Sequence, residues 1–237
     1  MFALRAAIAA CLFALACTGA AAANLQISPV SITFKPGQGA AGISLQNQGD
    51  TPIYGQVRAY AWAQRDGEDA LTETAELVAS PPIIEIAPGA TQTIRLILKA
   101  AATGTTERSF RLLVDEVPRG DSAESGVNIR LRYSVPVFAT PAGEAAPVLA
   151  WKVHRQGENW MLRVTNTGNQ HAQLGATRLR NAAGAEFDIS KGLLGYVLAG
   201  QERSWKLPVA ADARLDGKLT VQSTVNARPM TADAAAP

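Results

Sequence analysis

The sequence predicts an all-β protein built as two β-sandwich domains. Short runs that alternate apolar and polar residues recur every ten or so positions, separated by turn residues. No apolar pattern of helical period persists for three turns. Residues 141–147 have the alanine-, glycine- and proline-rich composition of a linker. We therefore expect one domain at residues 24–140 and a smaller one at 148–228.

Residues 1–23 have the features of a secretory signal peptide. Arg5 lies in the charged start, an apolar region follows, and small residues up to Ala23 suit a signal peptidase. Both cysteines, Cys11 and Cys17, lie in this segment, so we expect no disulfide and no zinc–thiolate site in the exported chain. Lipid attachment at Cys17 stays open as an alternative.

The charge of the chain is close to balanced, with 22 Lys+Arg against 20 Asp+Glu. No basic block predicts nucleic-acid binding, and no second hydrophobic span predicts a membrane anchor. A protein partner would have to be held by main-chain and apolar contacts.

Six alternating runs come first in the expected first domain. They cover Leu25–Phe34, Ile43–Gln46, Ile53–Trp62, Ile83–Ile86, Thr91–Leu98 and Ser109–Val117. A slip in parity at Ser28-Pro29 predicts a bulge or a change of sheet. Residues 63–79 are polar, and we expect them to be irregular.

The longest run, Val127–Phe138, organises the domain. Its apolar residues recur with a period of two, which places them on one face of a strand: Val127, Ile129, Leu131, Tyr133, Val135 and Val137. Twelve residues would reach roughly 40 Å. Pro136 favours a sheet edge or bulge, because proline donates no main-chain hydrogen bond. The run is either an ordinary half-buried strand or one that pairs with another polypeptide.

Five further runs follow the linker. They cover Val148–His154, Trp160–Asn166, His171–Leu179, Glu202–Leu207 and Leu219–Val225. The alanine-rich end, residues 229–237, is expected to be a disordered tail.

Residues for catalysis are scarce. The two histidines, His154 and His171, have no cysteine or carboxylate near them at metal-ligand spacing. Asp115 and Glu116 are adjacent on a strand and point to opposite faces, so they cannot share acid–base chemistry. No nucleophile elbow, phosphate loop or zinc-protease motif occurs. We expect no enzymatic activity, no metal and no cofactor.

Several motifs after the signal peptide occur in a fixed order. They are a strand ending in Phe34, Ser80-Pro81-Pro82, Ile86-Ala87-Pro88-Gly89-Ala90, Thr93-Ile94-Arg95-Leu96, Phe110-Arg111-Leu112 before Asp115-Glu116-Val117-Pro118, and Leu131-Arg132-Tyr133-Ser134-Val135-Pro136-Val137-Phe138. In this order and spacing they resemble the periplasmic pilus chaperones of the chaperone-usher pathway.

This resemblance implies a boomerang of two immunoglobulin-like domains that binds pilin subunits in its cleft. The chaperone lends a strand to the incomplete pilin and later delivers it to an outer-membrane usher. The lent residues would be Val127, Ile129 and Leu131, with Tyr133 extending the row. Whether the free chain self-associates to cover this strand stays open.

The sequence departs from the family where two basic residues hold the carboxylate at the pilin C-terminus. Ser31 and Pro136 stand there and carry no charge, a pattern that is similar to the archaic branch associated with spore-coat-U-type pilins. Arg111 is the first candidate for a replacement anchor and Arg132 the second, with a surface role as the alternative for each. Arg95 also matches a family arginine, which we expect to be structural.

The interdomain salt bridge of the family is also in doubt, because Glu107 matches its acidic member whereas Thr140 replaces its arginine. The sequence thus predicts a non-enzymatic periplasmic chaperone for pilus assembly. The main alternative is a secreted β-sandwich adhesin or pilus subunit, and an enzyme in the second domain is the third.

Overall fold

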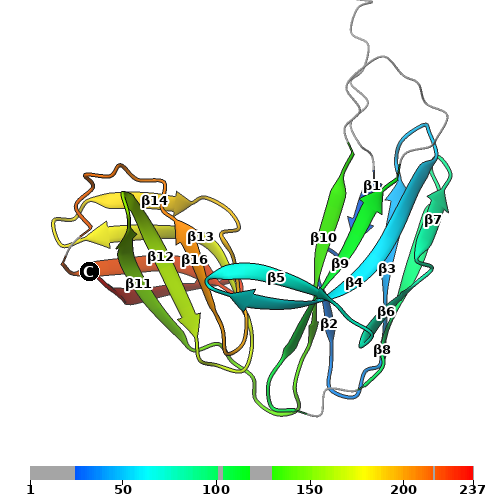
Figure 1. Ribbon diagram of the computed structural model, residues 1–237, viewed down its shortest axis with the longest axis horizontal. Coiled ribbons are helices and arrows are strands. Elements are labelled where there is room, and N and C mark those ends of the chain that lie inside the picture. The colour runs from blue at the N-terminus through cyan, green and yellow to red at the C-terminus, as the bar shows by residue number, and fades with distance from the viewer. Residues whose placement is uncertain (1–24, 101–103, 118–129, 216, 237) are drawn as a thin grey trace, which may run out of the picture.

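The computed structural model describes residues 25–100, 104–117, 130–215 and 217–236. These residues contain no helix and form two β-sandwich bodies arranged as an L (Figure 1). The all-β prediction is therefore confirmed, and the boomerang arrangement with it.

The first body packs a four-stranded sheet on a six-stranded sheet. The four-stranded sheet has the order β1-β3-β8-β6. Its strands are β1 (Leu25–Ser28), β3 (Ala40–Asn47), β6 (Leu77–Ser80) and β8 (Thr91–Leu98). The six-stranded sheet has the order β2-β10-β9-β4-β5, with β7 paired to β4. Its strands are β2 (Ile32–Phe34), β4 (Ile53–Arg65), β5 (Glu68–Glu73), β7 (Ile83–Ile86), β9 (Arg108–Glu116) and β10 (Arg132–Ala139).

The second body is one eight-stranded sheet with the order β14-β13-β17-β18-β11-β12-β16 and β15 paired to β13. A short parallel pairing of β11 with β18 joins its two layers. The strands are β11 (Leu149–Gln156), β12 (Asn159–Asn166), β13 (Ala172–Asn181), β14 (Glu186–Ser190), β15 (Gly195–Val197), β16 (Glu202–Lys206), β17 (Leu219–Val225) and β18 (Arg228–Ala235).

Three apolar clusters hold the molecule together. One lies between the two sheets of the first body and another inside the second body. The third is small and joins the bodies, with Trp62 and Phe138 from the first and Tyr196 and Leu198 from the second. This third cluster fixes the inner corner of the L.

A buried asparagine stabilises an equivalent turn in each body. Asn47 is buried and donates through Nδ2 to the carbonyls of Thr51 and Ile86, at 2.7 and 2.9 Å. Asn166 does the same with the carbonyl of Gln170 at 2.7 Å. Each asparagine also accepts from the glycine two residues later, which explains why the pattern Asn-x-Gly occurs at both turns.

The parity slip at Ser28-Pro29 marks a change of sheet. β1 pairs with β3 in the four-stranded sheet, whereas β2 pairs with β10 in the six-stranded sheet. This outcome confirms one of the two predicted explanations.

Two segments expected to lack structure are strands, so those predictions are wrong. Residues 63–79 contain the end of β4, then β5 and β6, and the turn Asp66-Gly67 joins β4 to β5. Residues 229–235 belong to β18, which pairs with β17 along its length and buries Ala234. Alanine has low β-propensity, but small side chains suffice where a neighbouring strand supplies the pairing.

Candidate functional site

One edge of β10 is open along part of its length. β10 pairs with β9 over all eight of its residues, from Arg132 to Ala139, but with β2 only from Val137 onward. No described strand pairs with the β2-side edge from Arg132 to Pro136. The segment before β2 does not cover this edge, because β1 lies in the four-stranded sheet, where it pairs with β3.

The main-chain groups at this edge follow from the alternation of the strand. The Leu131 carbonyl accepts from the Glu116 N–H at 3.2 Å, so odd-numbered residues of β10 face β9. The Thr140 N–H donates to Phe34 at 3.0 Å, so even-numbered residues face the β2 side. Arg132 and Ser134 therefore direct their N–H and C=O groups to the open edge. Pro136 lies in the same unpaired stretch, where its missing N–H costs nothing.

The apolar row of this strand begins inside the first body. Val135 and Val137 are buried in its core, and Tyr133 packs at the margin of that core. Burial raises the pKa of the Tyr133 hydroxyl above its ordinary value. Leu131 comes next and is half-buried, whereas Val127 and Ile129 lie outside the described residues. Of the predicted lent residues, Tyr133 thus serves its own core at least in part.

The face of the six-stranded sheet that turns away from the core lies on the inner side of the L and contacts the second body through Trp62 and Phe138 (Figure 1). We call this inner side the cleft and the sheet face its floor. Register places Arg111 on β9 between Pro136 on β10 and Tyr60 on β4. Further along β4, Trp62 and Gln64 pair with Leu71 and Asp69 of β5. The floor therefore mixes arginines, carboxylates and aromatic rings.

Arg111 stands at the inner corner of this floor. Its guanidinium carbon lies 3.6 Å from the centre of the Trp62 ring and 5.4 Å from that of Tyr196. No described side chain forms an ion pair or hydrogen bond with it. Burial lowers the pKa of Arg111, although Asp69 and Tyr196 oppose this shift. A half-buried cation on an aromatic platform without an anion is suited to bind one.

Arg132 is placed differently. Its side chain is 63% exposed and pairs with Asp115, which also accepts from Arg58 at 2.7 Å. Burial by itself raises the pKa of Asp115, but the hydrogen bonds from both arginines outweigh it and hold that pKa below its ordinary value. Arg132 therefore already has an anion, and the geometry favours Arg111 as the free cation. Glu116 lies on the core face, as the alternation predicts.

In the interdomain pair, the acidic residue Glu107 contacts a histidine and not the expected arginine. The Glu107 side chain is fully buried, and its Oε1 lies 2.7 Å from His171 Nδ1 and 3.1 Å from the His171 N–H. The His171 ring stacks on Phe138 at 3.6 Å between centroids. A histidine from the second body thus replaces the expected arginine. The sequence could not show this pair, because 64 residues separate its members.

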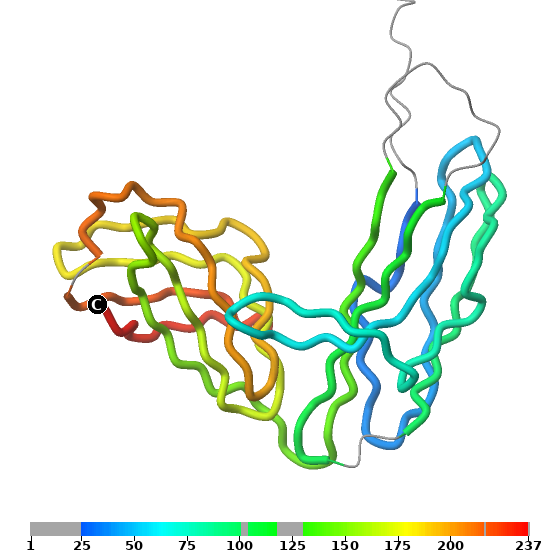
Figure 2. The backbone as a smooth tube through the Cα atoms, in the orientation of Figure 1, coloured from blue at the N-terminus to red at the C-terminus, as the bar shows by residue number. Residues whose placement is uncertain are grey.

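The β4–β5 hairpin provides a second connection between the bodies, and Figures 1 and 2 show it reaching across the corner. At its tip, the Gly67 carbonyl accepts from the Ser204 N–H at 2.9 Å and from Arg203 Nη1 at 2.8 Å. Gln64 donates to the Tyr196 carbonyl at 2.8 Å and accepts from the Leu198 N–H at 3.0 Å. These hydrogen bonds therefore connect the two bodies at the corner of the L.

Sequence reasoning missed Trp62, Gln64, Asp69 and Tyr196. Parity offered one signal for Trp62, because it shares the polar face of its strand with Arg58 and Tyr60. A large apolar residue on a polar face indicates a contact outside the domain. Nothing local could identify Tyr196, whose partners come from the other body.

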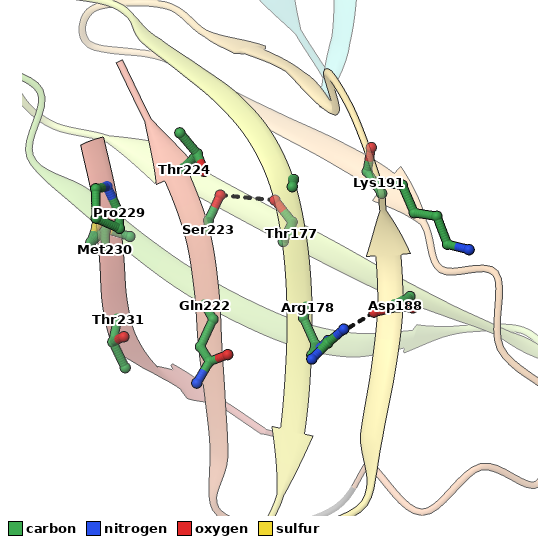
Figure 3. A pocket seen from close by; sticks show the side chains of 12 residues that line it. Thr177, Arg178, Asp188, Lys191, Gln222, Ser223, Thr224, Pro229, Met230 and Thr231 are labelled. Atoms are coloured by element: carbon green, nitrogen blue, oxygen red, sulfur yellow. Dashed lines mark hydrogen bonds and ion pairs between the residues drawn. The ribbon is translucent and has the colours of Figure 1, made fainter. Parts of the chain in front are cut away.

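The second body also has a groove. It has a volume of about 530 Å³ and lies across β14, β13, β17 and β18 (Figure 3). Of its two basic residues, Arg178 and Lys191, Arg178 is paired with Asp188 at 2.8 Å and with Glu186 at 2.9 Å, and the Thr177 hydroxyl lies 2.8 Å from that of Ser223. The charge of Arg178 and the hydroxyls of Thr177 and Ser223 are thus already paired, so the cleft with its unpaired Arg111 is the stronger candidate site.

Two further properties bear on the chemistry. Among the residues that the structure describes, no three His, Cys, Asp or Glu side chains gather as metal ligands. In the same residues, no helix has the length and hydropathy to cross a membrane. His154 lies on β11, and burial lowers its pKa.

Comparison with known families gives one match that covers just over half of the chain. The family is described as "Pili and flagellar-assembly chaperone, PapD N-terminal domain", and it matches residues 24–145. A relative from Escherichia coli K12, the uncharacterized fimbrial chaperone YcbF, is 32% identical over 108 residues. The match covers 42% of this chain and 44% of that protein, so the chain spans less than half of the relative's length.

Solved structures share the fold over most of the chain. In the CsuC–CsuE chaperone–tip adhesion subunit pre-assembly complex, from archaic chaperone-usher Csu pili of Acinetobacter baumannii, the matched chain is 26% identical with a TM-score of 0.72. The match covers 90% of this chain and 99% of that one. The Salmonella enterica SafA pilin–SafB chaperone complex matches at 15% identity and a TM-score of 0.60, covering 90% of this chain and 95% of that one.

Proposed function

Because this chain belongs to the family of pili and flagellar-assembly chaperones with the PapD-type N-terminal domain, we propose that it captures pilin subunits by lending them a strand. The family and the fold are those of non-enzymatic pilus chaperones. The similarity to the archaic Csu structure supports placement in the archaic branch, with pilins as clients. Its place of action is the periplasm, and it delivers the captured subunit to an outer-membrane usher.

The open edge of β10 carries this proposal. A client strand can add to the main-chain groups of Arg132 and Ser134, for which no described strand competes. The apolar row beyond Tyr133 would fill the client's groove with Leu131 and, by the period of the sequence, Ile129 and Val127. Each such side chain that becomes buried contributes about 1.5–3 kcal/mol before the costs of ordering.

Arg111 is the proposed anchor for the carboxylate at the client's C-terminus. A client strand on the open edge must end where β2 begins, beside Pro136, which pairs with Arg111. The carboxylate would then lie two strand spacings, about 10 Å, from the Arg111 backbone. In the structure the guanidinium lies over Trp62, on the β4 side of β9, so it must swing towards β10 to bridge this distance. Arg132 remains a second candidate only if it exchanges Asp115 for the client.

Substitution of Leu131 tests the lent strand. We expect Leu131→Asp to reduce the yield of a complex with a co-expressed spore-coat-U-type pilin about tenfold or more, because an unpaired carboxylate is costly to bury. Ile97→Asp is the matched control, since it places the same charge on an exposed apolar residue of β8, in the other sheet. Equal yields for wild type and Leu131→Asp would contradict strand lending.

The alternative of a secreted adhesin or pilus subunit predicts a different fate for the chain. A chaperone is absent from the finished fibre, whereas a subunit remains in it. Mass spectrometry of purified pili therefore separates the two, and recovery of this chain in stoichiometric amounts would favour the subunit.

A further inference from the structure

The cleft contains a carboxylate that could neutralise Arg111 but does not. Asp69 lies on β5 opposite Gln64, two residues along β4 from Trp62, whose ring carries the Arg111 guanidinium. The two side chains nevertheless form no ion pair. Asp69 is exposed and Arg111 is half-buried, so a pair between them would be only modestly favourable, and other contacts of Asp69 can outweigh it.

Two side chains hold the Asp69 carboxylate. Gln64 donates through Nε2 to Asp69 Oδ1 at 3.0 Å. Arg203, from β16 of the second body, places its Nε 3.8 Å from the same oxygen. The Arg203 side chain is only 17% exposed; its Nη1 donates to the Gly67 carbonyl at 2.8 Å and also pairs with Glu68, which fixes its direction.

The second body also fixes the position of Gln64. Its amide is clamped between the Tyr196 carbonyl and the Leu198 N–H, at 2.8 and 3.0 Å. The amide is therefore oriented before it meets Asp69. Both restraints on Asp69 thus originate in the second body.

We propose that Arg203 and Gln64 are positioning residues that hold Asp69 away from Arg111 and so keep this guanidinium free for the carboxylate of a bound client. The inference rests on the proposed function and gives the second domain a role in it. Without these restraints, Asp69 would compete for Arg111 as a tethered anion, with an effective concentration in the millimolar range or above.

A pair of synthetic peptides tests this arrangement with the full chain. One is a six-residue peptide of alternating valine and threonine that ends in a free carboxylate, and the other is the same peptide with a C-terminal amide. The ratio of their dissociation constants, measured by titration calorimetry, reports how available Arg111 is to a carboxylate. A loosened cleft would weaken both peptides equally and leave the ratio unchanged.

We expect wild type to prefer the free carboxylate about tenfold, and Arg111→Ala to lose the preference. Arg203→Gln should bring the ratio close to one, because Asp69 then pairs with Arg111. The double variant Arg203→Gln/Asp69→Asn should restore it, since asparagine keeps the oxygen that accepts from Gln64 but carries no charge.

The outcomes separate this inference from the proposed function. A wild-type ratio of one would overturn both the Arg111 anchor and this inference. A preference that Arg111→Ala abolishes but Arg203→Gln leaves intact would overturn only the role of Arg203. Failure of Asp69→Asn to restore the ratio in the double variant would overturn the competition by Asp69.

Discussion

Single residues on the cleft floor differ in whether their charge is already satisfied. Arg58 and Arg132 share Asp115, whereas Arg111 rests on Trp62 without an anion. All three arginines lie on the same face of one sheet, so the sequence pattern alone treats them alike. The partner across the strand, and not the residue type, decides which cation is available.

Asp115 gives the fold a defined sensitivity to acid. Its pKa is depressed in the folded chain, so its contribution to stability is present above the unfolded pKa of about 3.9 and is lost as pH falls through the lower folded value. We expect Asp115→Asn to cost about 1 kcal/mol of unfolding free energy at pH 7, because both arginines are partly exposed.

The difference between wild type and Asp115→Asn should shrink below about pH 4, which urea unfolding followed across pH can measure. Asp188→Asn, an exposed pair with Arg178 in the second body, provides the control for a remote site. A difference that stays constant down to pH 2 would show that Asp115 does not act through its charge.

Among the elements, the β4–β5 hairpin has the most demanding geometry. Its two-residue turn places both Asp66 and Gly67 at positive φ, of 53° and 76°. This is the turn that suits the twist of a hairpin and that favours Asp-Gly. A side chain at Gly67 would also collide with the Ser204 side chain, since its Cβ would lie 2.7 Å from Oγ. The turn therefore fixes the contact between the bodies as well as the hairpin.

We expect Gly67→Ala to destabilise the chain by more than the ~1 kcal/mol of backbone strain that alanine suffers at positive φ. The additional cost comes from displacement of β16. Gly89→Ala is the matched control, because Gly89 has a φ of 72° and open space around it. Thermal unfolding of both variants measures the difference, and equal losses of stability would contradict the steric contact with Ser204.

The whole molecule behaves as one unit only while the corner between the bodies is intact. Buried Glu107 has one side-chain partner, His171, and its second carboxylate oxygen has none among the described residues. The apolar cluster of Trp62, Phe138, Tyr196 and Leu198 surrounds the same corner. Loss of the histidine would leave a buried carboxyl group without its side-chain hydrogen-bond partner.

We expect His171→Ala to cost about 1–3 kcal/mol and to split a single calorimetric transition into two. The double variant His171→Ala/Glu107→Gln should recover part of the loss, because the glutamine is neutral. His154→Ala is the control, since His154 lies on β11 away from the first body. A single, unshifted transition in His171→Ala would show that Glu107–His171 does not join the domains.

Local periodicity was sufficient for most strands but not for all. It predicted the strands that bury large β-branched or aromatic residues, and the change of sheet at Ser28-Pro29. It missed β5, β6, β14, β15 and β18, which are short or rich in charged and small residues, because neighbouring strands impose their pairing. The Asp66-Gly67 pair was an available hairpin signal for β5.

In the candidate site, too, the features that lie within one strand could be predicted, whereas the contacts between strands could not. The sequence predicted the apolar row of β10 and singled out Arg111, because both depend on alternation along one strand. It could not indicate that Arg132 is neutralised, that His171 replaces the expected arginine, or that Asp69 contacts Gln64 and Arg203. Each of these relations joins different segments of the chain.

The sequence by itself determined the all-β class, the resemblance to pilus chaperones and the face on which each residue of β10 lies, since these follow from periods and motifs within single segments. Only the tertiary structure decided where β10 loses its neighbour, which cation remains free and how the second body restrains the first. The reason is physical: hydrogen-bond pairing and charge compensation depend on distances in space, and the groups that meet, such as Glu107 and His171, are far apart in sequence.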